Sequence, residues 1–132
     1  MKVLVVDDDE ATRYAWTRVL AGAGATVKAA ENAEGALQVL RTDAVDVLLS
    51  DLVLPGLSGL RLLERVRTLP RHVIAIAVTA FNEEGQRERA IRAGFDVYLV
   101  KPVDPLVLVQ EIAQRMSPPA PRPGEARPPT GA

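Results

Sequence analysis

The 132-residue sequence contains no cysteine and a single histidine, His72. Disulfide bonds and thiolate metal sites are therefore excluded, and one histidine alone cannot build a histidine-based metal site or relay. No apolar run approaches the roughly 20 residues that a membrane span requires. The N-terminus also reaches acidic residues too early to serve as a signal peptide. We therefore expect a cytoplasmic protein without a membrane segment.

The sequence also has little excess charge of either sign. Its 16 Lys and Arg residues nearly balance 17 Asp and Glu residues, which gives a formal net charge of −1. Such a balance provides no general attraction to nucleic acid or to anionic membranes. We therefore expect no direct nucleic-acid partner, and any strong electrostatic function must be local.

Five short apolar runs recur along the chain. They cover Val3–Val6, Thr26–Ala29, Val47–Leu49, Val73–Val78 and Val97–Val100. Because these runs are apolar throughout rather than alternating, they predict strands of a parallel sheet that is covered on both faces.

Segments with helical spacing separate the strands. The first helix is predicted from Thr12, Ala15, Trp16, Val19 and Leu20, and ends at Gly22 or Gly24. In its apolar stripe, Trp16 is expected in the core rather than in a ligand stack. The second is predicted from Ala36, Leu37 and Leu40 with a cap at Asn32, and the third from Leu60, Leu63 and Val66, starting near Ser58.

The last two helices have clear end signals. The fourth is predicted to begin at an Asn82 cap with Glu83 and Glu84 in its first turn, and to end at Gly94. The fifth opens with Asp104-Pro105, and its core stripe is Leu108, Val109, Ile112 and Met116. The order (βα)5 predicts an α/β fold with a doubly wound five-stranded parallel sheet.

Residues 117–132 differ in composition from the rest. Six prolines, at positions 118, 119, 121, 123, 128 and 129, lie among Gly, Ala and Arg with almost nothing to bury. This segment is expected to be a disordered, proline-rich tail that follows a single domain of residues 1–116.

Polar side chains follow four of the five apolar runs directly. Asp7, Asp8 and Asp9 follow the first, Ser50 and Asp51 the third, Thr79 the fourth, and Lys101 and Pro102 the fifth. The carboxyl ends of parallel strands share one edge, where open sheets bind ligands. Crowded carboxylates need a compensating cation, and Mg²⁺ prefers oxygen ligands. For Asp9, a helix cap is an equally good interpretation.

These strand-end residues resemble the set found in response-regulator receiver domains of two-component signalling. The segment from Asp51 to Gly59 resembles the phosphoacceptor segment of that family, and Val100-Lys101-Pro102 resembles its lysine-proline segment. The resemblance extends from Lys2 to Met116 and implies a flavodoxin-like strand order, 2-1-3-4-5.

The resemblance also implies a metal site and an acceptor. Asp51 would accept a phosphoryl group from a histidine kinase or a histidine phosphotransfer protein. The carboxylates of Asp8 and Asp51 and the backbone carbonyl of Val53 would bind Mg²⁺, and Asp7 would act through a metal-bound water.

The remaining implied roles concern the phosphoryl group and the switch. Thr79 would donate its hydroxyl to a phosphoryl oxygen, and Lys101 would pair with the phosphate across a cis Lys101–Pro102 peptide bond. Tyr98 matches the switch aromatic of the family, although it is also consistent with an ordinary half-buried tyrosine. The fourth helix, fifth strand and fifth helix would then form the surface that a downstream protein recognises.

Two groups of apolar residues carry further expectations. Val53 and Phe81 flank the path of the hydrolytic water in the resembled family, and neither side chain orients water, so slow self-dephosphorylation is predicted. Within Leu106–Val109, four consecutive apolar residues cannot all face the core. Leu106 or Val107 is therefore expected at the surface, either at a homodimer or partner contact or simply as an exposed apolar side chain.

Other functions fit less well. An aspartyl-phosphate phosphatase or phosphotransferase would need a cap insertion, and no loop is long enough, so catalysis beyond the chain's own phosphoryl chemistry is not expected. A flavodoxin-like cofactor protein would need a Gly/Ser/Thr loop where this chain has three aspartates. A non-phosphorylated docking module and the receiver part of a hybrid histidine kinase, which Ala93–Pro105 resembles, both stay open.

Overall fold

The computed structural model describes residues 1–80 and 83–116 and contains one five-stranded parallel sheet. Its strands are β1 (Lys2–Val6), β2 (Thr26–Ala30), β3 (Val47–Ser50), β4 (Ile74–Thr79) and β5 (Val97–Val100). Their spatial order is β2-β1-β3-β4-β5, and every neighbouring pair is parallel. The predicted fold class and strand order are confirmed.

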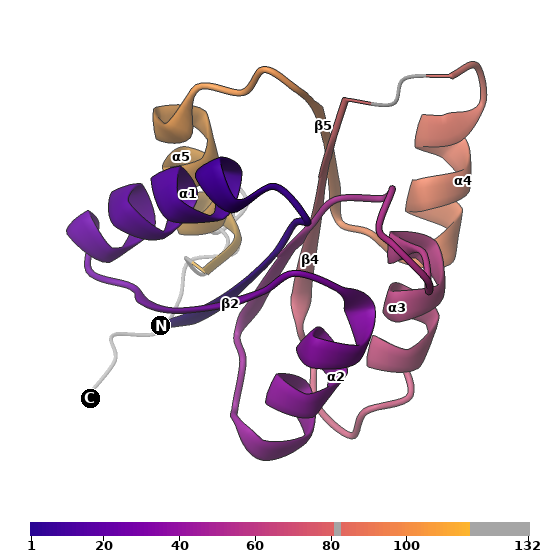
Figure 1. Cartoon of the computed structure of the whole chain (residues 1–132), viewed down its shortest axis with the longest axis horizontal. Coiled ribbons are helices and arrows are strands. Elements are labelled where there is room, and N and C mark those ends of the chain that lie inside the picture. Colours follow the sequence, from indigo (N-terminus) through magenta and orange to yellow (C-terminus); the bar gives the residue numbers. More distant parts are fainter. Residues whose placement is uncertain (81–82, 117–132) are drawn as a thin grey trace, which may run out of the picture.

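Five helices cover the sheet in two layers (Figure 1). They are α1 (Glu10–Gly22), α2 (Ala33–Thr42), α3 (Gly59–Val66), α4 (Gln86–Ala93) and α5 (Pro105–Met116). Helices α1 and α5 lie on one face, and α2, α3 and α4 lie on the other (Figure 1). No helix in the described part of the chain is both long and apolar enough to cross a lipid bilayer.

The sheet divides the core into two layers. Val3 and Val5 of β1 pack in the layer beneath α1 and α5, whereas Leu4 and Val6 pack in the layer beneath α2, α3 and α4. Successive strand residues point to opposite faces, so an apolar run without alternation is buried on both sides. Trp16 is only 6% exposed in the first layer, which confirms that it belongs to the core.

Polar caps begin three of the helices. The side chains of Asp9, Asn32 and Ser58 accept the N–H groups of Thr12, Gly35 and Arg61. Each such cap stabilises its helix by about 1 kcal/mol. The predicted cap at Asn32 and the predicted start near Ser58 are confirmed.

Helix α4 begins later than predicted. It starts at Gln86, after Gly85 in a left-handed conformation with φ 80°, and no side chain caps it. Glu83 and Glu84 therefore precede the helix instead of forming its first turn, and Asn82 lies outside the described residues. The Gln86 N–H donates to the Glu83 carbonyl, which closes a tight turn there. The end at Gly94, with φ 117°, is as predicted.

Three further expectations about burial are wrong. Strand β2 is an edge strand with half-exposed or exposed side chains, so it is not covered on both faces. Ala15 of α1 and Met116 of α5 are exposed, so the buried stripe of each helix is narrower than the spacing of its apolar residues predicts. Leu106 and Val107 are both exposed, in agreement with the expectation for that segment.

Arg67 ties together the ends of several elements after α3. Its guanidinium donates to the carbonyls of Val73 and Gly94 and pairs with Asp96 at 3.2 Å. The same Asp96 carboxylate accepts the N–H of Ala75 at 2.8 Å. The end of α4 and the beginnings of β4 and β5 are thereby joined through one side chain.

A second charged cluster joins Asp43, at the end of α2, to Lys2 of β1 and Lys28 of β2. The Asp43 carboxylate lies 2.9 Å from the Lys28 ammonium and 3.3 Å from the Lys2 ammonium. The hydrogen bonds from Lys28 and from the Thr42 hydroxyl lower the pKa of Asp43 from 3.8 to about 2. Folding therefore favours the ionised form of this carboxyl.

This lowered pKa predicts an acid-sensitive contribution to stability. The contribution of Asp43 should be present above about pH 4 and be lost as the pH falls toward 2, because the unfolded chain binds the proton more tightly. Urea unfolding at about pH 5 should show wild type more stable than Asp43→Asn, with the gap closing at about pH 2. The pKa of Asp43 measured by NMR should rise in Lys28→Gln. An equal gap at both pH values would contradict this account.

Candidate functional site

The parallel hydrogen-bond ladder continues past the strands and fixes the residues at their carboxyl ends. The Asp51 N–H donates to the Val6 carbonyl at 3.0 Å, and the Lys101 N–H donates to the Thr79 carbonyl at 2.9 Å. Asp7 follows β1 directly in the same way. The structure therefore places the strand-end residues predicted from the sequence along one edge of the sheet.

Lys101 follows the outermost strand β5, and its ammonium reaches inward to the carboxylates after β1 and β3. Its Nζ donates to Oδ2 of Asp7 at 2.8 Å and to Oδ2 of Asp51 at 3.0 Å. The other oxygen of each carboxylate accepts a backbone N–H, from Asp9 at 2.9 Å and from Val53 at 3.0 Å. The two side chains are only 1% and 10% exposed, and both carboxylates are hydrogen-bonded on both oxygens.

The carboxylates determine the charge state of Lys101. Burial alone would lower the pKa of its ammonium, but hydrogen bonds to Asp7 and Asp51 outweigh that effect and raise the pKa above its usual 10.5. The ammonium is therefore fully charged at neutral pH and provides a fixed positive centre between two acids.

Asp8 completes an acidic cluster with Asp7 and Asp51. One carboxylate oxygen from each of the three residues lies within 4.8 Å of the other two. Asp8 is exposed while the other two are buried, so the cluster is open to solvent on one side. A hard divalent cation such as Mg²⁺ prefers oxygen ligands at this spacing, and the donor set fits the predicted metal.

Asp9 has a different task from its two acidic neighbours. Its Oδ2 accepts the backbone N–H of Thr12 at 3.0 Å and the Thr12 hydroxyl at 2.5 Å. These two hydrogen bonds lower the pKa of Asp9 and make it the cap of α1. Of the two interpretations of this residue, the helix cap is the one that the geometry supports.

Thr79 and Val53 line an open cavity of about 320 Å³, together with Asp51 and Ala80. Thr79 is buried, whereas the Val53 side chain is 57% exposed at the mouth of the cavity. Phe81, also predicted to flank this space, lies outside the described residues. The cavity leaves room next to Asp51 for a small group.

Tyr98 and the Lys101–Pro102 peptide complete the predicted set. Tyr98 is paired in register with Ala77 of β4, is 5% exposed, and has a pKa raised by burial. It is therefore more deeply buried than a half-buried surface tyrosine, and its switching role stays a prediction. The Lys101–Pro102 bond is cis, as expected.

Sequence reasoning missed two residues that hold the site in place. A Cβ on Gly59 would lie 2.3 Å from the Asp51 carbonyl oxygen and 2.8 Å from the Leu52 Cα, so only glycine fits where α3 begins. Arg13 of α1 donates from Nη1 to the Asp7 carbonyl at 2.7 Å. Neither contact follows from local patterns, because each joins segments that the chain brings together only on folding.

The comparisons with known proteins agree with this geometry. Residues 3–113 match the family model described as the response regulator receiver domain. The chain is 44% identical to an uncharacterized 14.6 kDa protein from Leptolyngbya boryana, over 86% of this chain and 88% of that one. It is 36% identical to the sensor histidine kinase RcsC of Salmonella typhimurium, over 86% of this chain but only 12% of the kinase.

A solved structure extends the agreement to three dimensions. The CheY-like response regulator receiver domain protein of Methanospirillum hungatei superposes with a TM-score of 0.82 at 30% sequence identity. The superposition covers 86% of this chain and 91% of that chain.

The close approach at Gly59 yields a stability prediction. Gly59→Ala should lower the free energy of unfolding by about 1–3 kcal/mol, because the added methyl meets backbone atoms that cannot rotate away. Gly22→Ala is the matched control, since a Cβ there meets nothing within 4 Å. Urea unfolding of both variants checks the prediction, and equal stability of Gly59→Ala and wild type would contradict it.

Proposed function

Because this chain belongs to the response regulator receiver domain family of two-component signalling, we propose that it is a cytoplasmic switch that is phosphorylated on Asp51. The donor would be a histidine kinase or a histidine phosphotransfer protein. The observation that carries the proposal is the Lys101 ammonium, which bridges Asp7 and Asp51 beside the cavity that Thr79 lines. The Asp51 carboxylate therefore lies beside both the Lys101 ammonium and a cavity lined by the buried Thr79.

The reaction is a displacement at phosphorus. A carboxylate oxygen of Asp51 attacks the phosphorus of a phosphohistidine, and the P–N bond breaks with its electron pair remaining on the imidazole nitrogen. That nitrogen then takes a proton from solvent. Phosphoryl transfer needs little covalent help from the protein, so positioning and charge neutralisation account for most of the catalysis.

Each residue of the site would contribute to that neutralisation. Lys101 would exchange a carboxylate oxygen for a phosphoryl oxygen within reach of its flexible stem, and the Thr79 hydroxyl would donate to another. Asp8 and Asp51, with the Val53 carbonyl and a water held by Asp7, would bind Mg²⁺. The ion, when bound, supplies positive charge against the phosphoryl oxygens.

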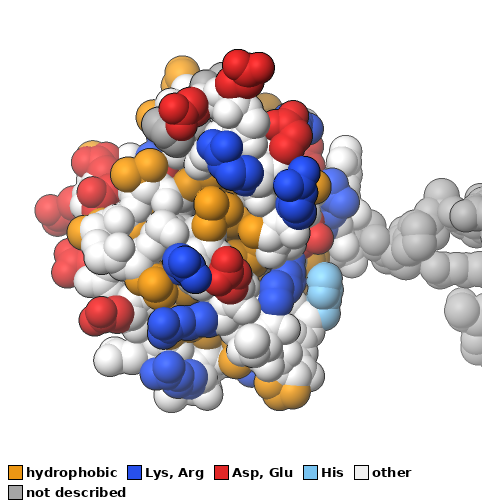
Figure 2. Space-filling model, turned by 90° about the vertical axis from the view of Figure 1, so that its right-hand side faces the viewer, with side chains coloured by type: hydrophobic (Ala, Val, Ile, Leu, Met, Phe, Trp, Pro, Cys, Tyr) orange, Lys and Arg blue, Asp and Glu red, His pale blue; other side chains and the backbone are white. Residues whose placement is uncertain are grey.

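The switch would pass from the acceptor to the other edge of the sheet. Phosphorylation adds about −1.5 to −2 charges beside Thr79, and Tyr98 on the adjoining strand would respond to its movement. The surface of α4, β5 and α5 would then engage a downstream protein or a second copy of the chain. On the side of the molecule shown in Figure 2, basic and acidic side chains are mixed rather than gathered into one patch of a single sign.

Of two alternatives within the family, one has specific support. The similarity to part of a sensor histidine kinase supports the alternative that the chain is the receiver portion of a hybrid kinase. A docking module that is never phosphorylated would retain the fold without the chemistry. The receiver family is a signalling module, and the only catalysis we propose is the chain's own phosphoryl transfer and slow self-dephosphorylation.

Direct phosphorylation tests the proposal. Incubation with acetyl phosphate and Mg²⁺ should add one phosphoryl group to the wild-type protein, as measured by intact mass. Asp51→Asn and a sample without divalent metal should stay unmodified, because each lacks an essential part of the site. Failure of the wild-type protein to react with acetyl phosphate or a phosphohistidine donor would favour the docking-module alternative.

The exposed Val53 predicts a long-lived phosphorylated state. Its apolar side chain borders the cavity beside Asp51 and cannot orient a water molecule by hydrogen bonding. Val53→Asn should therefore lose its phosphoryl group several-fold faster than wild type, as followed by intact mass after removal of the donor. Leu106→Asn changes an equally exposed apolar side chain away from Asp51 and should decay at the wild-type rate. A Val53→Asn lifetime equal to or longer than that of wild type would refute this explanation.

A further inference from the structure

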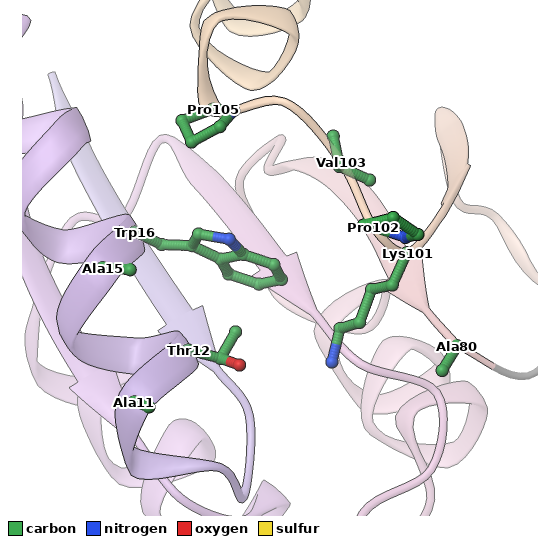
Figure 3. Close-up of a pocket in the computed structure, with 9 residues that line it drawn as sticks. All are labelled: Ala11, Thr12, Ala15, Trp16, Ala80, Lys101, Pro102, Val103 and Pro105. Carbon is green, nitrogen blue, oxygen red and sulfur yellow. The ribbon is translucent and has the colours of Figure 1, made fainter.

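Lys101 has a third neighbour besides the two carboxylates. Its Nζ lies 5.6 Å from the centre of the Trp16 ring, within the range of a cation–π contact. Trp16 comes from α1, and Figure 3 shows its indole extending from that helix toward the Lys101 side chain. Helix α1 thereby reaches the lysine at the end of β5.

The position of the indole does not depend on the lysine. Trp16 is 6% exposed and packs in the same core layer as Leu20, Leu108 and Ile112. On its open side, small and rigid residues border a cavity of about 630 Å³, which separates the indole from the loop after β5 (Figure 3). The ring is therefore a fixed surface against which a flexible lysine can rest.

The indole differs from the carboxylates in one respect that matters for the chemistry. Asp7 and Asp51 hold Lys101, but they also belong to the acidic cluster that fits a divalent ion. A divalent ion would therefore draw on the two carboxylates that hold Lys101, whereas a hard cation that prefers oxygen ligands does not compete for an indole face. The contact of Lys101 with Trp16 would therefore be retained with a metal ion bound.

We propose that Trp16 is a positioning residue that keeps the Lys101 ammonium at the acceptor while metal and phosphoryl group bind. The proposal rests on the proposed function of Asp51, and it assigns Trp16 no contact with the phosphoryl group. A cation–π contact at a partly exposed site changes an equilibrium about two- to fivefold. Its loss should slow phosphorylation by about that factor.

Substitution of Trp16 distinguishes the effect of the aromatic face on Lys101 from the effect of packing in the core. Trp16→Leu keeps an apolar side chain but lacks a ring, and should be phosphorylated by acetyl phosphate about two- to fivefold more slowly at saturating Mg²⁺. Trp16→Phe retains a ring and should recover most of the rate. Leu20→Val, in the same helix and core layer, is the control for destabilisation alone and should react at the wild-type rate. Equal rates in Trp16→Leu and wild type, or an equal loss in Leu20→Val, would overturn the proposal.

Fluorescence tests the contact without any phosphorylation. Trp16 is the single tryptophan of the chain, so its emission reports on this site alone. Lys101→Gln should change the emission of the metal-free protein, and the difference from wild type should persist at saturating Mg²⁺. A difference that vanishes when Mg²⁺ is added would show that the lysine leaves the indole, and would overturn the proposal even if Trp16→Leu folds poorly.

The two experiments also distinguish a failure of the proposed function from a failure of the role proposed for Trp16. A wild-type protein that takes no phosphoryl group speaks against the proposed function, whatever its fluorescence. A wild-type protein that is phosphorylated but shows no fluorescence difference from Lys101→Gln speaks against the role of Trp16 alone.

Discussion

The ion pairs that Lys101 makes with Asp7 and Asp51 are the interaction on which the site depends. Three carboxylates that each place an oxygen within 4.8 Å of the others repel one another, and the Lys101 ammonium opposes that repulsion. At about 4 Å and an effective dielectric constant near 20, each pair of opposite charges contributes about 4 kcal/mol before desolvation. The lysine therefore stabilises the acidic cluster of the folded chain.

The same pairing organises the site in the folded chain. The desolvation of the acids and of the ammonium is completed when the chain folds, and the backbone N–H groups of Asp9 and Val53 hold the carboxylates in place. Under the proposed function, a charged donor and a hydroxyl would already be positioned for a phosphoryl group, which is the main requirement of phosphoryl transfer. The two carboxylates and the ammonium are thus already organised in the folded chain.

Much of this arrangement could be predicted from the sequence, because it follows from local patterns. Unbroken apolar runs specify buried strands, and polar residues at their carboxyl ends meet wherever the sheet is parallel. The exposure of β2 could not be predicted, because an edge position depends on strand order rather than on composition. The later start of α4 depends on the left-handed turn at Gly85, which prevailed over the helix signals before it.

The unforeseen parts of the site share one physical origin. Gly59 against the Asp51 backbone and Trp16 against the Lys101 ammonium both join parts of the chain that meet only when it folds. Periodicity identifies Trp16 as a core residue, which it is, but it does not reveal what lies beside the ring. Such contacts are fixed by the packing of helices on the sheet, to which no local pattern is sensitive.

Arg67 fixes one end of α4. The guanidinium fastens the Gly94 end of the helix to the starts of β4 and β5, while the Gln86 end begins at a glycine without a side-chain cap. The Gly94 end of α4 is therefore tied to the sheet through one side chain, whereas its Gln86 end follows a glycine. A rotation of α4 about the Gly94 end would move Gln86 furthest.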